Sequence, residues 1–286
     1  MERIPFVGLH AHCGVGSPFD GFGYPKDHME YAYSNGSKAL AMTDHGNMNG
    51  LAYQVMHAKK MKAEGKDFKP IYGVEAYFIP SVAEWKEQLE EFRKDKKLAK
   101  QIDKGQSGTT IENEGASKGI SKHDINRRRH LVLLAQNQTG LNNLFKMVSQ
   151  SYNGDNFYRY PRIDFNLLEQ YGEGIIAASA CLGGVYAGCY WENRDEGSEA
   201  VLNCMREVTK QFQATLGDRW YAELQWNNIP EQHELNKYII QVAGEMGVKL
   251  ISTCDSHYPD PEAWQSRELY KRLGWLGRKP EWASME

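Results

Sequence analysis

The chain has 286 residues, of which 41% are hydrophobic and 12% aromatic, and its formal net charge is -3. This apolar content can build a core, and the mean hydropathy of -0.64 with no long apolar run excludes a membrane span. The small negative charge excludes a general basic field, so contact with nucleic acid would depend on local patches or bound metal cations. Five cysteines without regular spacing favour reduced thiols, and the N-terminus lacks a signal pattern. We therefore expect a soluble, cytoplasmic protein with no membrane partner.

Apolar runs alternate with helical sequence along the chain. An opening strand at residues 6–12 is expected first, then a Gly-rich loop at 14–23 and a helix that begins at Pro25 and is stopped by Gly36. Further strands are expected at 39–42, 71–78, 130–135, 174–180, 220–224 and 249–254, and helices at 49–64, 84–104, 141–152, 165–171, 196–216, 230–247 and 261–273. Seven strands that alternate with helices predict parallel pairing in a closed or nearly closed α/β barrel. An open doubly wound sheet is the alternative, but its Gly-x-Gly-x-x-Gly turn does not follow the first strand.

One charged stretch interrupts the alternation. Residues 81–127 hold a Glu- and Lys-rich helix, expected to be solvated, and a connector at 105–122 with a flexible composition. The triplet Arg127-Arg128-Arg129 leads from this insertion into the next expected strand. Its charge could contact phosphate, but an ordinary solvated turn is the favoured interpretation. We expect one barrel domain over residues 1–275 with this insertion, and a tail over 276–286.

Polar residues gather at the ends of the expected strands. His10 and His12 are two residues apart, so a strand directs both imidazoles to one side. Glu75 interrupts an apolar strand, which costs free energy unless the carboxylate is paired or binds a metal. Asp255 and His257 follow the last strand, which barrel closure would place beside the first. The whole set is His10, His12, Asp20, Asp44, His45, Glu75, His130, Cys181, Asp255 and His257.

The chemistry of this set predicts a metal centre. Nitrogen and oxygen ligands with one thiolate suit Zn²⁺, Mn²⁺ or Fe²⁺ rather than Ca²⁺. A catalytic zinc needs only three protein ligands, so the set is large enough for two or three divalent ions. Such a site suits phosphoester hydrolysis, because two cations can hold the phosphoryl and leaving oxygens and generate hydroxide near neutral pH.

The same residues lie in motifs that closely resemble a known family. The motifs are Leu-His-Ala-His at 9–12, Ala-Leu-Ala-Met-Thr-Asp-His-Gly-Asn-Met at 39–48, Gly-Val-Glu-Ala-Tyr at 73–77, Arg-His-Leu-Val-Leu-Leu-Ala at 129–135, Pro-Arg-Ile-Asp at 161–164, Ala-Ser-Ala-Cys-Leu-Gly-Gly at 178–184 and Asp-Ser-His-Tyr at 255–258. In this order they resemble the polymerase and histidinol phosphatase (PHP) domain, in the version found at the N-terminus of the bacterial DNA polymerase III alpha subunit, a C-family replicative polymerase. The resemblance covers roughly residues 4 to 270, apart from the insertion.

The resemblance implies a distorted seven-stranded βα barrel with up to three metal ions. His10, His12, Glu75 and Asp255 would bind the first ion, Glu75, His130 and Cys181 the second, and Asp20, His45 and His257 the third. Asp44 would orient His45 or neighbouring ligands, and His12, Asp44 and Glu75 would take part in catalysis. The loop before Asp20 is one residue longer than is usual in the family, and the adjacent Cys13 is an alternative ligand to Asp20.

The resemblance also implies a function, a metal-dependent 3′→5′ exonuclease that removes mismatched nucleotides from a DNA primer 3′ end. Two alternatives remain: a metal-stabilised scaffold and partner-binding module without turnover, and a stand-alone phosphatase for small phosphate esters. An amidohydrolase also carries a His-x-His strand, but no lysine lies at a strand end in the place of its modified metal-bridging lysine. We expect no polymerase activity from this chain alone, with the remaining polymerase domains on another chain or in a longer precursor.

Overall fold

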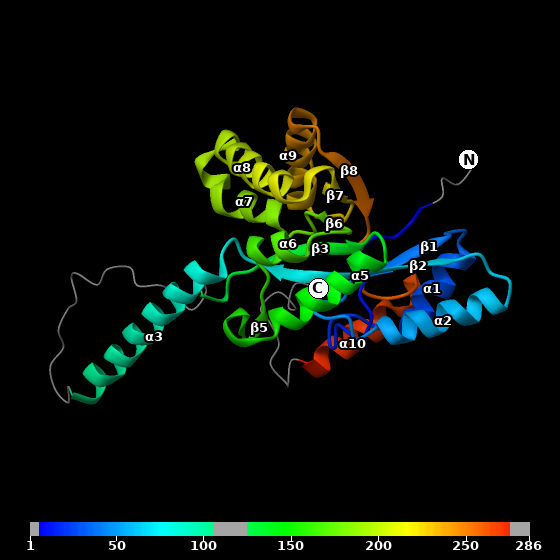
Figure 1. The fold of residues 1–286 in the computed structure, drawn as a ribbon, viewed down its shortest axis with the longest axis horizontal. Coiled ribbons are helices and arrows are strands. Elements are labelled where there is room, and N and C mark those ends of the chain that lie inside the picture. The colour runs from blue at the N-terminus through cyan, green and yellow to red at the C-terminus, as the bar shows by residue number, and fades with distance from the viewer. Residues whose placement is uncertain (1–5, 106–124, 275–286) are drawn as a thin grey trace.

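The computed structural model describes residues 6–105 and 125–274 (Figure 1). Its strands are β1 (Ala39–Met42), β2 (Lys69–Phe78), β3 (Arg129–Ala135), β4 (Phe157–Tyr158), β5 (Tyr160–Pro161), β6 (Ile175–Ala178), β7 (Trp220–Gln225) and β8 (Lys249–Thr253). Its α-helices are α1 (Pro25–Ser34), α2 (Leu51–Ala63), α3 (Val82–Gly105), α5 (Gln138–Ser151), α6 (Phe165–Tyr171), α7 (Val185–Asn193), α8 (Ser198–Leu216), α9 (Pro230–Met246) and α10 (Trp264–Gly274). The connector after α3 and the C-terminal tail lie outside the described residues, so the expectations for them and for the domain boundaries stay predictions.

Six strands form one curled sheet in the order β1-β2-β3-β6-β7-β8. Neighbours β1 and β2, β6 and β7, and β7 and β8 are parallel, whereas β3 runs antiparallel to both β2 and β6. Strands β4 and β5 form a separate hairpin. The barrel-like α/β fold is confirmed, but the expectation that all its strands are parallel is wrong at β3.

The reversal of β3 follows from the path of α3, which projects from the body of the molecule instead of packing back across the sheet (Figure 1). The first turns of α3 contact the segment that leads into β3, where the Trp85 indole donates a hydrogen bond of 2.9 Å to the Ile125 carbonyl. Trp85, Leu89 and Ile125 are buried together. The expectation of a solvated helix is therefore wrong for this end of α3. The chain thus enters β3 at the end of the sheet where it left β2 and must run the opposite way.

The expected first strand is present as isolated bridges. Gly8 pairs with Leu40 of β1, and Ala11 pairs with Ser256 just after β8, in both cases parallel. The His12 amide donates to the Ser256 carbonyl at 2.8 Å. Because β1 and β8 are the two edges of the sheet, this segment serves as a seventh strand that joins them. The predicted closure beside His10 and His12 is therefore confirmed.

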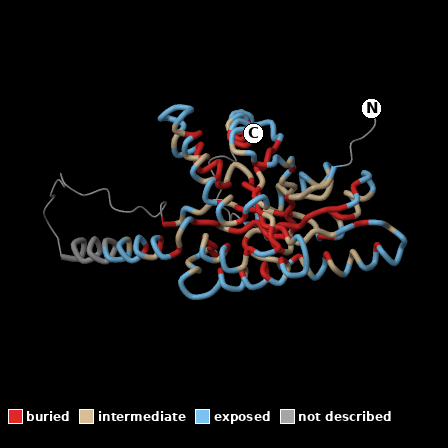
Figure 2. Tube along the Cα trace, turned by 45° about the horizontal axis from the view of Figure 1, so that its top comes forward, coloured by how far each residue is buried: buried red, intermediate tan, exposed pale blue. Residues whose placement is uncertain are grey.

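Helices cover the outside of the sheet, and the buried residues concentrate along its strands (Figure 2). The largest core includes side chains of α5, α7, α8 and α9, with the Phe212 and Trp220 rings stacked at 4.1 Å. Sequence patterns predicted neither α7 nor the β4–β5 hairpin. A disulfide joins Cys189 of α7 to Cys204 of α8, so the expectation of reduced thiols is wrong for this pair. Within residues 6–105 and 125–274, no helix is long and apolar enough to span a bilayer.

Candidate metal centre

All nine predicted metal ligands lie at one end of the barrel. They come from the N-terminal segment and its loop, the segment after β1, the second half of β2, the start of β3 and the turns after β6 and β8. The nine residues, here called the ligand cluster, are His10, His12, Asp20, His45, Glu75, His130, Cys181, Asp255 and His257. His130 is the exception among them because it lies at the start of its strand. Only the reversed direction of β3 brings it to the end of the barrel where the other strands finish.

Glu75 lies at the centre of the ligand cluster and is fully buried. Its Oε1 is 3.2 Å from His10 Nε2 and 3.0 Å from His130 Nδ1. Its Oε2 is 2.6 Å from His45 Nδ1 and 3.5 Å from His12 Nε2. Burial disfavours the charged carboxylate, but His130, His10 and His45 outweigh burial and hold the pKa of Glu75 well below its usual range. Each oxygen thus faces two histidines, as expected for a carboxylate shared between cations.

Asp255 completes the group expected around the first ion, with Oδ1 at 3.0 Å from His12 Nε2 and 3.3 Å from His10 Nε2. Four buried atoms here make no hydrogen bond to any described residue: His10 Nε2, His12 Nε2, Glu75 Oε2 and Asp255 Oδ1. Buried polar atoms nearly always have a partner. A cation among them would satisfy all four, so these residues fit a divalent metal.

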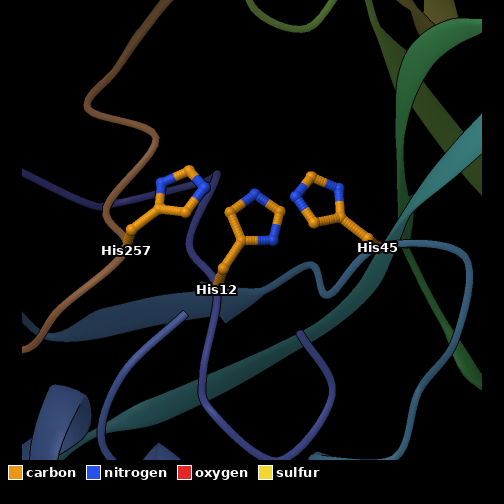
Figure 3. A group of neighbouring side chains, drawn as sticks. All are labelled: His12, His45 and His257. Atoms are coloured by element: carbon orange, nitrogen blue, oxygen red, sulfur yellow. The ribbon is translucent and has the colours of Figure 1, made fainter. Parts of the chain in front are cut away.

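A second part of the ligand cluster contains three neighbouring imidazoles (Figure 3). The His12 ring lies 4.2 Å from that of His45 and 4.6 Å from that of His257, and their ligand atoms are within 4.8 Å of one another. Asp20 Oδ2 is 2.9 Å from His45 Nε2 and 3.3 Å from His257 Nε2. The structure therefore brings Asp20 to the predicted partners despite its longer loop, and it adds His12 to them. Arg267, which the sequence did not single out, donates to Asp20 Oδ1 at 2.9 Å.

Cys181 lies beside the predicted second group, with Sγ 3.5 Å from His130 Nδ1 and 3.8 Å from Glu75 Oε1. The Gly183 amide donates to this sulfur at 3.4 Å. Without a cation, burial and the nearby Glu75 and Asp255 carboxylates raise the pKa of the thiol well above its usual value. A metal ion would favour the thiolate instead, so the acidic surroundings of Cys181 suit a cation-bound state.

Asp44 lies behind the ligand cluster rather than against the His45 ring. It accepts hydrogen bonds from the Cys13 amide at 2.8 Å and from Ser17 Oγ at 3.0 Å. Ser17 Oγ in turn lies 3.4 Å from His12 Nδ1 and accepts from the His45 amide at 3.2 Å. Burial beside Asp44 raises the pKa of the Cys13 thiol to about 12, which disfavours the thiolate that would replace Asp20. The geometry favours a positioning role for Asp44, through Ser17.

Glu223 is a site residue that the sequence reasoning missed. This buried carboxylate lies 2.7 Å from His10 Nδ1, and it accepts from Thr253 Oγ1 at 2.5 Å and Gln225 Nε2 at 2.9 Å. The pairing leaves His10 Nε2 directed at Glu75. The available signal was a single Glu inside an otherwise apolar strand, the same pattern that identified Glu75.

The protonation of the histidines follows from their neighbours. Burial disfavours the cation of His10, but Asp255, Glu223 and Glu75 outweigh it and hold the pKa of His10 well above its ordinary value. Glu75 and Asp20 likewise outweigh burial at His45 and raise its pKa to about 10. Burial and the charge of His45 lower the pKa of His12 to about 3. In the absence of metal, protons on His10 and His45 thus neutralise part of the carboxylate charge that a metal ion would neutralise.

This geometry agrees with the family that the chain matches. Residues 8–227 match the model of the PHP domain family, and the chain therefore belongs to that family. The resemblance drawn from its motifs is confirmed.

Among individual proteins, the chain is similar to bacterial DNA polymerase III alpha subunits. It is 38% identical to the subunit of Aquifex aeolicus over 257 residues, which cover 90% of this chain and 18% of that protein. It is 31% identical to the subunit of Borreliella burgdorferi over 279 residues, which cover 98% of this chain and 20% of the relative. The chain thus spans about a fifth of the length of these relatives.

Two solved structures are similar over most of the chain. An amidohydrolase from Chromobacterium violaceum with bound sulfate is 14% identical, with a TM-score of 0.49, and the match covers 92% of this chain and 96% of that one. A putative metal-dependent phosphoesterase from Bifidobacterium adolescentis is 16% identical, with a TM-score of 0.42 and coverage of 91% and 90%.

Proposed function

We propose that the chain is a metal-dependent phosphoesterase that removes nucleotides from the 3′ end of DNA, a 3′→5′ exonuclease. The observation that carries this proposal is the arrangement around Glu75, whose two oxygens each face two histidines. A carboxylate shared in this way suits a site with more than one cation. Membership of the PHP family and the similarity to polymerase III alpha subunits support DNA as the substrate.

In this proposal the ligand cluster holds two or three ions of Zn²⁺, Mn²⁺ or Fe²⁺. When bound, they supply hydroxide near neutral pH and stabilise charge on the phosphoryl oxygens. His10, His12, Glu75 and Asp255 hold one ion, Glu75, His130 and Cys181 a second, and Asp20, His45 and His257 a third. Glu223 keeps Nε2 of His10 free for its ion, and Ser17, held by Asp44, orients His12.

The proposal also places the chain within a larger polymerase. The relatives are about five times as long as the matched region, and the remaining polymerase domains would lie on a longer precursor or on another chain. In that setting the primer 3′ end would move between a polymerase site elsewhere and the ligand cluster.

The test uses metal-loaded protein and a labelled primer whose 3′ end is mismatched to its template. We expect release of nucleotides from the 3′ end, lost with EDTA and in His12→Ala because that change removes a ligand. His233→Ala, an exposed histidine of α9, is the matched control and should keep full activity. No release by the wild type, with His12→Ala behaving identically, would refute the proposal.

The same preparation distinguishes the alternatives. A scaffold without turnover would lose thermal stability on metal removal but cleave neither DNA nor a small phosphate ester. A stand-alone phosphatase would hydrolyse p-nitrophenyl phosphate in preference to the primer. Each pattern would replace exonuclease activity as the function of this domain.

A further inference from the structure

Two aromatic rings flank the ligand cluster on the side of the β4–β5 hairpin. Tyr77 follows Glu75 by two residues on β2, so both side chains lie on one face of the strand. The Tyr77 ring lies 5.6 Å from that of His130 and 6.2 Å from that of His45. The ring of Tyr160 packs edge-on against Tyr77 at 5.4 Å. The ring of Tyr77 therefore lies between the ring of Tyr160 and the candidate metal ligands His45 and His130.

The guanidinium of Arg128 lies against both rings. Its Cζ is 3.4 Å from the centroid of Tyr160 and 4.8 Å from that of Tyr77. Nη1 donates to the Asn126 carbonyl at 3.1 Å, and Nε is buried without a hydrogen-bond partner. Among the described side chains, no carboxylate lies within ion-pair distance of Arg128.

The neighbouring arginines have a different environment. Arg127 forms an ion pair with Glu192 at 3.1 Å, and Arg129 pairs with the same carboxylate. The sequence favoured a solvated turn for this triplet over phosphate contact. In the described part of the chain, Arg128 is the member of the triplet with no carboxylate partner. Its positive charge is available to an anion at the rim of the ligand cluster.

A buried arginine fixes the elements that carry this group. Arg162 donates to the carbonyls of Tyr158 and Tyr160 at 2.8 and 3.0 Å, which holds the hairpin. It also donates to the carbonyl of Ile125 at 3.3 Å, in the segment that leads into Arg128. One side chain therefore sets the relative position of Tyr160 and Arg128, so the guanidinium is placed before any ligand arrives.

We propose that Arg128, held between Tyr77 and Tyr160, binds a backbone phosphate of the substrate strand next to the phosphodiester at the ligand cluster. The inference rests on the proposed function and names the feature of the substrate that the site selects, a second phosphate. A guanidinium matches a phosphate with two parallel hydrogen bonds. The net charge of the chain provides no general attraction for DNA. The guanidinium of Arg128 would therefore contribute a large part of the affinity for the strand outside the ligand cluster.

This arrangement distinguishes a nucleotide chain from a small phosphate ester. An ester with one phosphate occupies only the ligand cluster, whereas a DNA strand also offers the phosphate that Arg128 binds. Loss of the Arg128 charge should therefore weaken the use of DNA and leave hydrolysis of the small ester unchanged.

The test compares Arg128→Gln with Arg127→Gln, which removes the same charge from the neighbouring, carboxylate-paired position. The substrates are a fluorescein-labelled single-stranded oligonucleotide and p-nitrophenyl phosphate, and both variants are loaded with metal and assayed for metal content. For Arg128→Gln we expect KM for the oligonucleotide to rise about 10- to 100-fold, as for a lost charge-assisted contact. Its metal content and its kcat/KM for p-nitrophenyl phosphate should match the wild type, and Arg127→Gln should change little.

Binding without turnover gives an independent measurement. Anisotropy of a labelled oligonucleotide with a phosphorothioate 3′ end, titrated with metal-loaded protein, should show a salt slope smaller by about one in Arg128→Gln. Arg128→Lys, which keeps the charge but not the planar fork, should recover part of the affinity. If the wild type hydrolysed neither substrate, the proposed function would fail, and the anisotropy would still decide whether Arg128 binds a strand.

Three results would overturn the inference. They are unchanged oligonucleotide KM and affinity in Arg128→Gln, equal weakening in Arg127→Gln, and loss of metal or of p-nitrophenyl phosphate hydrolysis in Arg128→Gln. The second result would indicate a nonspecific charge effect, and the third a structural role for the side chain.

Discussion

Glu223 and His10 form a buried pair behind the ligand cluster. The carboxylate oxygen lies 2.7 Å from His10 Nδ1, and Thr253 and Gln225 hold that oxygen in place. A histidine that donates Nδ1–H to a carboxylate is fixed in the tautomer that offers Nε2 to a metal, and it becomes more basic. His12 has only the hydroxyl of Ser17 in the corresponding place. The two imidazoles of the first segment are therefore oriented by different groups.

Replacing Glu223 with Gln should lower metal affinity about tenfold, because the charge that fixes and polarises His10 is lost. The measurement is a Zn²⁺ titration against a competing chelator, with the number of bound ions counted by elemental analysis. Glu234→Gln is the control, because that carboxylate accepts a hydrogen bond from Tyr190 away from the ligand cluster. Equal affinities in the two variants would show that Glu223 does not position His10.

The pKa of His45, raised to about 10 by Glu75 and Asp20, makes the metal-free protein sensitive to pH. A raised folded-state pKa contributes stability that is fully present below the ordinary value of 6.5 and is lost as pH rises toward 10. His10 acts in the same direction, while His12 is neutral in the folded and unfolded states above pH 6.5. We expect the melting temperature of EDTA-treated protein to fall between pH 6.5 and 10, and less steeply in His45→Gln. A rise over this interval would contradict the assignment.

At the scale of elements, the segment after the hairpin ties several parts of the molecule together. Asp164 Oδ2 accepts from the amide of Val82, the first residue of α3, and Oδ1 accepts from the amide of Leu167 in the first turn of α6, both at 3.0 Å. One carboxylate therefore satisfies two helix N-termini. The neighbouring Arg162 fixes the hairpin and the lead into β3. The Pro-Arg-Ile-Asp motif thus supports the site without contributing a ligand.

Asp164→Ala should lower the free energy of unfolding by about 1–3 kcal/mol, because two helix caps worth about 0.5–2 kcal/mol each are lost. Urea denaturation measures the change. Asp195→Ala, whose exposed carboxylate has only a 3.9 Å contact with Arg194, should stay within about 0.5 kcal/mol of the wild type. A loss at Asp164 no larger than at Asp195 would show that the two caps contribute little.

At the scale of the whole molecule, the ligand cluster joins both ends of the described chain. His10 and His12 lie in the segment that bridges β1 and the end of β8, and Asp255 follows β8. A cation shared by these residues, as proposed above, would close the barrel at the point where the described sheet has only isolated bridges. Metal binding would therefore be linked to the folding of the entire domain.

Metal removal should lower the melting temperature of the wild-type protein. One site at a free metal concentration of 100 times its Kd adds about 2.7 kcal/mol. For a domain of this size that corresponds to a shift of roughly 5–10 °C. Calorimetry with and without EDTA measures it, and His12→Ala, which lacks a ligand, should show a much smaller shift. Identical melting temperatures with and without EDTA in the wild type would exclude a stabilising metal site.

Local sequence patterns alone predicted most of the helices and strands of this protein and several residues of the ligand cluster. Strands and helices follow from apolar periodicity and from the Pro and Gly at helix ends, and the two-residue period of a strand predicted that His10 and His12 face one point. The lone Glu75 in an apolar strand marked the centre of the ligand cluster. These inferences succeed because they depend on residues close together in the chain.

Only the tertiary structure decided features that depend on distant partners. The direction of β3 follows from the contact of Trp85 with Ile125 across the insertion, and this direction decides at which end of the barrel His130 lies. The pairing of Glu223 with His10 joins positions 213 residues apart. Arg128 lies between Tyr77 of β2 and Tyr160 of the β4–β5 hairpin. Its position therefore also depends on the packing of this hairpin against β2. No local period encodes such contacts, because burial and charge complementarity between distant segments select them only when the chain has folded.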